Sequence, residues 1–271
     1  MGSPAPRDQP VRARPATWPA DIRAVAIGVA LGVLVLASGA MLAWYGAVVA
    51  LRFAAALLAA LLVQQAFVTI MRRATGPERS TPADALTLTR ASAGGVLAGI
   101  AASGVHDRVG LAGWLACGAV VAGATVLDWV DGPLARRLGP TNLGGALDIE
   151  ADSWVTLWSG VAAVTLSGLP WWCVLAPMLH YARPALAIRR GGLPAGGDPW
   201  WGRVTGVAQM ALFIAALAPV TGPIRDSALP VLAPPIGAAQ LLVMLVLVAR
   251  LASGHRELIT SSRRAGGRAD S

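Results

Sequence analysis

Long apolar stretches, separated by short polar or arginine-containing stretches, occupy most of the chain. The stretches are continuously apolar rather than alternating, which indicates helices rather than strands. About 20 apolar residues cross a bilayer as a helix, and a helix satisfies its own backbone hydrogen bonds within lipid. We therefore predict an all-α, polytopic membrane helix bundle. Its spans are expected near 24–47, 50–71, 86–104, 110–128, 144–168, 172–188, 203–220 and 234–251.

Composition and charge agree with a multi-pass protein of the cell membrane. The 271 residues are 55% hydrophobic and 13% charged, whereas a soluble domain has about 25% charged residues. The net charge is +8, and every basic residue other than histidine is arginine. Eighteen arginines would lie on the side of the N-terminus, against Arg52, Arg108 and Arg225 on the other side. This bias predicts cytoplasmic N- and C-termini, and it favours anionic headgroups rather than nucleic acid as partners.

The ends of the chain differ from its apolar part. Residues 1–22 are rich in Pro, Ala and Arg, which is typical of a disordered cytoplasmic tail. Residues 23–75 would hold two N-terminal membrane spans. Thr81-Pro82-Ala83-Asp84 is typical of a helix start, with Pro in the first turn and Asp near the positive end of the helix dipole. Residues 253–271 are predicted to form a basic cytoplasmic tail.

Acidic side chains gather in one segment. The chain has 14 acidic residues, and five of them lie between 128 and 152. Asp128 and Asp131 are three residues apart, and Asp148 and Asp152 are four apart, so each pair shares one helix face. The turn at 139–141 would return the second helix antiparallel to the first. Four carboxylates are therefore expected to converge at the cytoplasmic face.

Ionised carboxylates at the end of a membrane span are unfavourable unless they are paired, solvated or bound to cations. Ligation by oxygen alone favours Mg²⁺ or Mn²⁺. Four aspartates suffice for two divalent ions roughly 3.5–4 Å apart, which would clamp a phosphoryl group. An ion-pair network with Arg136 or Arg137 would explain two carboxylates but not four on matched faces. Glu150 should point away from the face of Asp148, so it is left out of the set.

The segment from Asp128 to Asp152 reads Asp-x2-Asp-Gly-x2-Ala-Arg-x7-Gly-x3-Asp-x3-Asp. This pattern strongly resembles the signature of the class I CDP-alcohol phosphatidyltransferase family. The resemblance covers residues 80–252 as a six-span core, because Leu86-Thr-Leu-Thr-Arg90 is similar to the entry helix of that core. The two spans before residue 80 would be additions to the family's minimal pattern.

The resemblance implies a phosphotransferase of phospholipid biosynthesis. A CDP-linked lipid, usually CDP-diacylglycerol, would be attacked at its β-phosphate by the hydroxyl of a small polar alcohol, with release of CMP. The two metal ions would be held by Asp128, Asp131, Asp148 and Asp152. Asp152 would also be the general base. The CDP moiety would contact Gly132, Ala135 and Gly144, with Arg136 on a phosphate or on the carboxylates. A homodimer is a further expectation from the family.

The acceptor site is less specified. Its candidates flank the cytoplasmic ends of two later spans and are His180, Arg183, Arg189, Arg190 and Arg203. Arg183 lies about two turns inside a span, which favours a functional site. Arg189 and Arg190 can instead extend to the membrane interface, and His180 can be a hydrogen-bonded interior residue. Two converging arginines would favour a phosphorylated acceptor. The identity of the acceptor alcohol stays open.

Two other functions compete with this hypothesis. An intramembrane, Mg²⁺-dependent prenyltransferase also uses Asp-rich motifs, but it carries them far apart on separate repeats. A non-enzymatic cation transporter should spread its acids through the membrane depth, whereas these acids cluster at one end of their spans. Release of CMP from CDP-diacylglycerol would distinguish the phosphatidyltransferase from both.

Overall fold

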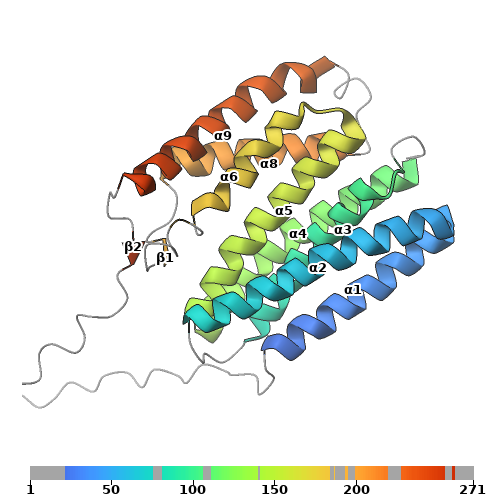
Figure 1. Ribbon diagram of the computed structural model, residues 1–271, viewed down its shortest axis with the longest axis horizontal. Coiled ribbons are helices and arrows are strands. Elements are labelled where there is room, and N and C mark those ends of the chain that lie inside the picture. Colours follow the sequence, from blue (N-terminus) through green and yellow to red (C-terminus); the bar gives the residue numbers. More distant parts are fainter. Residues whose placement is uncertain are drawn as a thin grey trace, which may run out of the picture.

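A bundle of helices forms the fold (Figure 1). The computed structural model describes residues 22–75, 81–105, 111–139, 141–183, 186, 193–194, 199–218, 227–253 and 258–259. The elements are α1 (Ile22–Tyr45), α2 (Ala47–Thr75), α3 (Pro82–Ala102), α4 (Leu111–Leu138), α5 (Asn142–Ser167), the 3₁₀ turn η2 (Trp171–Val174), α6 (Leu175–His180), α8 (Trp200–Leu217) and α9 (Leu229–Ala252), with the two-residue strands β1 (Leu193–Pro194) and β2 (Leu258–Ile259).

The predicted polytopic helix bundle is confirmed. Among the described residues, five helices are long and apolar enough to cross a membrane: α1, α2, α3, α4 and α9. Helix α5, helix α8 and the η2–α6 segment are also helical where spans were predicted, but they do not reach that criterion. The count of eight spans therefore stays a prediction. Of the tail predicted at 1–22, residue 22 already begins α1, and residues 1–21 lie outside the described residues, as does most of the tail at 253–271.

The short antiparallel pairing of β1 with β2 was not predicted. Leu193 pairs with Ile259, and Pro194 pairs with Leu258. The pairing places a segment that follows α6 beside a segment that follows α9, at one end of the bundle (Figure 1).

Helix α3 lies at the centre and packs against α1, α2, α4 and α5. Small residues make this possible, because a β-carbon at Gly99 would lie 2.7 Å from the ring of Phe53 on α2. The predicted start of the helix is confirmed: Thr81 caps α3 by accepting a hydrogen bond from the backbone N–H of Asp84, and the Asp84 carboxylate accepts one from Thr81 N at 2.6 Å. This capping box begins α3 at residue 82, four residues before the predicted span.

Helices α4 and α5 differ from the prediction in one respect, which is the part played by α3. As the predicted turn at 139–141 requires, α4 continues beyond the predicted span to Leu138, so Asp128 and Asp131 lie well within it. The sequence Thr141-Asn142 then starts α5, with the Thr141 hydroxyl accepting from Gly144 N at 2.9 Å. Helix α3 packs on both α4 and α5 more extensively than those two helices pack on each other. Three helices therefore surround the carboxylates, where a two-helix hairpin was expected.

Candidate metal and phosphate site

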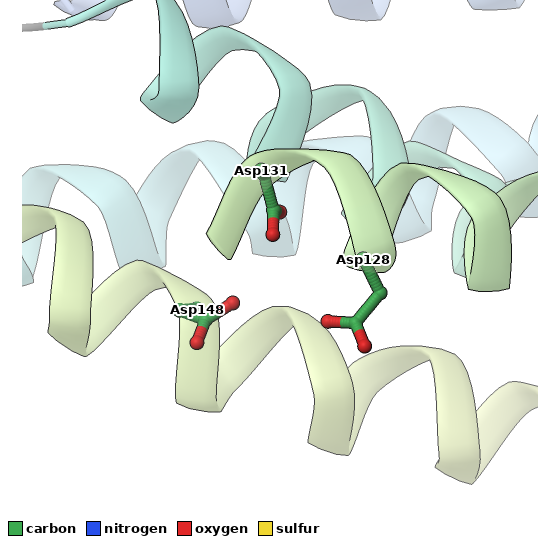
Figure 2. A group of neighbouring side chains, drawn as sticks. All are labelled: Asp128, Asp131 and Asp148. Carbon is green, nitrogen blue, oxygen red and sulfur yellow. The ribbon is translucent and has the colours of Figure 1, made fainter. Parts of the chain in front are cut away.

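The carboxylates of Asp128, Asp131 and Asp148 face one another across α4 and α5 (Figure 2). One oxygen from each lies within 4.8 Å of the others. The side chain of Asp131 is only 5% exposed, whereas those of Asp128, Asp148 and Asp152 are 45%, 49% and 60% exposed. Asp131 therefore forms the buried floor of the group, and the other three line its open side.

A single guanidinium joins all four aspartates. Arg90, on α3, is 2% exposed, and its Nη1 contacts Asp128 Oδ1 and lies 3.4 Å from Asp131 Oδ2. Its Nη2 lies 2.7 Å from Asp148 Oδ1 and 3.2 Å from Asp152 Oδ1. Nη2 also donates to the backbone oxygen of Asp148 at 3.1 Å. One positive charge against four carboxylates leaves the group with an excess of negative charge.

The sequence placed Arg90 in the entry helix but did not predict it as a site residue. The sequence feature that could have identified Arg90 as a site residue is its place inside an apolar span. It also follows Asp84 and Thr87 at three-residue intervals, so the three residues lie near one face of the helix. Thr87 Oγ1 donates to Asp131 Oδ2 at 3.1 Å, so this face of α3 reaches the carboxylates at two points. The arginines that the sequence offered as neutralising partners, Arg136 and Arg137, are exposed near the end of α4.

The small residues of the motif occupy two different environments. A β-carbon at Gly132 would meet only Arg136 Nη1, at 3.5 Å, and Ala135 is half-buried beside it. A β-carbon at Gly144 would instead lie 2.8 Å from both Asp84 Oδ1 and Thr141 Oγ1. Gly144 is thus required by the packing of α3 on α5, a reason that the motif alone does not reveal.

Other predicted residues lie away from the four carboxylates. Glu150 is outside the group, as expected, and lines a separate cavity. His180 ends α6 and packs edge-on against Tyr181, with ring centroids 5.9 Å apart. Arg183 is buried, and Arg203 is exposed on α8. Arg189 and Arg190 lie outside the described residues.

The donor set fits a hard divalent cation. Every candidate ligand is a carboxylate oxygen. Arg90 contacts one oxygen of each aspartate, and no contact described in this part of the chain uses the second oxygen. The second oxygens, three of them on the exposed aspartates, can therefore ligate a cation while Arg90 stays in place. Such an ion, when bound, supplies Lewis-acid stabilisation of a phosphoryl group.

Comparison with known proteins identifies the family. Residues 80–252, well over half of the chain, match the family model described as CDP-alcohol phosphatidyltransferase. No curated protein and no solved structure gave a match. The matched segment begins before α3 and ends with α9, so it includes Arg90 and all four aspartates, while α1 and α2 precede it. The chain therefore belongs to the CDP-alcohol phosphatidyltransferase family, which transfers a phosphatidyl group from a CDP-alcohol to an acceptor.

Proposed function

We propose that this protein transfers the phosphatidyl group of CDP-diacylglycerol to the hydroxyl of a small polar alcohol, releasing CMP, in phospholipid biosynthesis. The acceptor oxygen forms a bond to the β-phosphorus as the bond from that phosphorus to the bridging oxygen breaks. CMP leaves with the bridging oxygen, and the acceptor's proton passes to a base. The observation that carries this proposal is the convergence of the four motif aspartates on Arg90.

All four aspartates are metal ligands in this proposal, and one of them is also the general base. We assign Asp128, Asp131, Asp148 and Asp152 to two divalent ions, Mg²⁺ or Mn²⁺, on the basis of their all-oxygen donor set. Asp152 is the most exposed of the four and lies outside the group of three mutually close carboxylates. Its position suits a general base, because a base must reach the hydroxyl of an incoming acceptor.

Arg90 has a positioning role in this proposal. Four carboxylates brought together repel one another, and the repulsion is stronger where water is excluded. The buried guanidinium lies between α4 and α5 and offers donors in a fixed planar fork. It therefore sets the carboxylates at ligand spacing before a metal ion binds.

The CDP moiety is placed on the exposed side of α4. Gly132 leaves open space there for a ligand, and the exposed Arg136 can reach a phosphate. The small side chain of Ala135 on the same face also leaves room for the CDP moiety. Gly144 is included from the family motif, although its immediate neighbours are Asp84 and Thr141.

The active site is assigned to the cytoplasmic face, with the acceptor entering from the same side. The ends of α2 and α4 carry Arg72, Arg73, Arg136 and Arg137, and the starts of α3 and α5 lie at the same end of the bundle (Figure 1). The buried Arg183 is the strongest candidate for contact with a polar acceptor, with His180 and Arg203 as further candidates.

An acceptor panel tests this function. Purified protein with Mg²⁺ or Mn²⁺ would receive CDP-diacylglycerol and, separately, glycerol 3-phosphate, inositol phosphate, inositol, serine or choline. We expect CMP and a new phospholipid with at least one alcohol, and no turnover when a prenyl diphosphate replaces the CDP-lipid. Turnover of the prenyl diphosphate alone would contradict the proposed donor.

A further inference from the structure

Two adjacent glutamines, Gln64 and Gln65, lie in the part of α2 that is long and apolar enough to cross a membrane. Their amides bind different helices. Gln64 is 7% exposed, and its amide nitrogen donates to Leu88 O of α3 at 3.2 Å. Gln65 donates instead to Ala26 O of α1 at 3.0 Å. An amide in lipid is unfavourable unless it is hydrogen-bonded, so the two side chains join α2 to α3 and to α1 respectively.

The Gln64 amide contacts one turn of α3 at two residues, Leu88 and Ser92. Besides its bond to Leu88 O, the amide nitrogen donates to Ser92 Oγ at 3.4 Å. The Ser92 hydroxyl, which is fully buried, donates in turn to Leu88 O at 2.9 Å. Gln64 is thus part of a small buried network that spans the turn from residue 88 to residue 92.

Arg90 lies in the same turn of α3, on its other side. Leu88 comes two residues before Arg90 and Ser92 two residues after it. At 3.6 residues per turn, each of these positions is rotated by roughly 160° from the direction of Arg90. Gln64 therefore contacts the back of the turn whose front directs the guanidinium between α4 and α5.

Close packing alone does not fix the orientation of this turn. Helix α2 lies along α3 (Figure 1). A β-carbon at Gly95 would lie 3.1 Å from Leu57 Cδ1, and one at Gly99 would lie 2.7 Å from the ring of Phe53. These apolar contacts bring the two helices together, but apolar burial is non-directional. The hydrogen bond from Gln64 is directional, so it restrains the rotation and the height of α3.

The contacts of Arg90 require such a restraint. Its two terminal nitrogens contact aspartates on two different helices, with Asp128 on one side and Asp148 on the other. A small rotation of α3 would shorten the contacts on one side and lengthen those on the other. Misplacement of a site residue by about 1 Å can lower a rate about 100-fold.

We propose that Gln64 is a positioning residue for Arg90. From a helix that precedes the family segment, it holds the turn of α3 whose guanidinium spaces the four aspartates. The N-terminal helix α2 is therefore a working part of the enzyme. The expected effect on turnover rests on the proposed function, whereas the expected effect on metal affinity does not require turnover.

Substitution of the two glutamines tests this role. Gln64→Leu removes the amide at similar size, and Leu88 O keeps its bond from Ser92. Gln65→Leu is the matched control, because Gln65 binds α1. Calorimetric titration with Mn²⁺ and CMP release would be measured on the full-length protein in nanodiscs. We expect Gln64→Leu to raise the Mn²⁺ Kd and lower kcat by about 3- to 20-fold, the equivalent of one hydrogen bond between transmembrane helices. Gln65→Leu should change neither quantity.

A purely structural contact would give a different result. It would lower the Tm, or the number of Mn²⁺ sites per chain, and leave the Kd of the folded protein unchanged. That result would overturn the positioning role, as would an equal change in Kd for Gln64→Leu and Gln65→Leu. If the wild-type protein binds Mn²⁺ but releases no CMP with any alcohol, the proposed function fails, and the Mn²⁺ Kd still tests Gln64. A wild-type protein that binds no Mn²⁺ would overturn both.

A double-mutant cycle tests whether Gln64 acts through Arg90. Once Arg90→Lys has removed the guanidinium, Gln64→Leu should change the Mn²⁺ Kd by less than about twofold, because the group that it positions is gone. The same fold-change in the wild-type and Arg90→Lys backgrounds would show that Gln64 acts independently of Arg90 and would contradict the proposal.

Discussion

Arg90 Nη2 lies 2.7 Å from Asp148 Oδ1 and 3.1 Å from the backbone oxygen of the same residue. The two contacts join the middle of α3 to the beginning of α5, and the other guanidinium nitrogen contacts Asp128 on α4. Charge-assisted contacts of this kind are strong and directional. One side chain thus links three helices at the carboxylates.

Replacement of Arg90 by lysine separates the charge of that side chain from its shape. Arg90→Lys keeps a positive charge but cannot donate to two carboxylates on each side, so we expect kcat/KM to fall by about 10²–10³-fold, comparable to the loss of a preorganised donor. Arg137→Lys, at an exposed position on α4, should leave kcat/KM unchanged. CMP release measured for both variants checks this. A fully active Arg90→Lys protein would contradict the positioning role.

A matched threonine pair isolates the contact between α3 and Asp131. Thr87 and Thr89 both donate to the carbonyl four residues earlier, but only Thr87 also donates to Asp131. Thr87→Val should lower kcat/KM by about 10- to 100-fold, the effect of one hydrogen bond to a charged group, while Thr89→Val should not. Initial rates at several CDP-diacylglycerol concentrations measure both effects. Equal rates for the two variants would show that the Thr87 contact does not support the site.

The two glycines of the motif should respond differently to alanine. Gly144→Ala places a β-carbon against Asp84 and Thr141, so we expect a lower Tm along with reduced activity. Gly132→Ala has room for the methyl group, so its Tm should be unchanged and its KM for the CDP-lipid should rise. Thermal unfolding in detergent and substrate titration give the two quantities. A lower Tm for Gly132→Ala, with unchanged KM, would remove it from the proposed nucleotide surface.

Substitution of Asp152 and substitution of Asp131 should each lower enzyme activity, but for different reasons. Asp152→Asn removes the proposed base, so kcat should fall about 10²–10⁴-fold, with a smaller change in metal affinity. Asp131→Asn changes the buried carboxylate of the group, so it should weaken Mn²⁺ binding more than Asp152→Asn does. Calorimetric titration with Mn²⁺ and CMP release separate these effects. Retained turnover in Asp152→Asn would remove the base assignment.

The sequence predicted the helices and the carboxylate group well because both depend on local spacing. Continuous apolar stretches determine helices in lipid, and the i, i+3 and i, i+4 intervals determine which aspartates share a face. The end of α4 was predicted by the turn residues at 139–141 and not by hydropathy. Hydropathy ends near residue 128, but the backbone stays helical through Leu138, because loss of apolar character marks the membrane boundary rather than the helix end.

Long-range contacts could not be read from spacing. Arg90 is 38 residues from Asp128 and 58 from Asp148 in the sequence, and its partners are fixed by the packing of α3 between two helices. For the same reason, residue spacing does not indicate that Gly144 accommodates Asp84. The cavity beside Glu150 depends on α2, and residue spacing does not indicate which residues of α2 line it.

Metal-dependent CMP release from CDP-diacylglycerol tests the central claim most directly. The purified full-length protein, stripped of metal with a chelator, should release no CMP until Mg²⁺ or Mn²⁺ is restored. With the metal and an accepted alcohol present, CMP and the new phospholipid should form in equal amounts, and a variant with Asp128, Asp131 and Asp148 changed to Asn should form neither. Absence of CMP release by the metal-loaded wild-type protein with every alcohol, or undiminished release by that variant, would contradict the account.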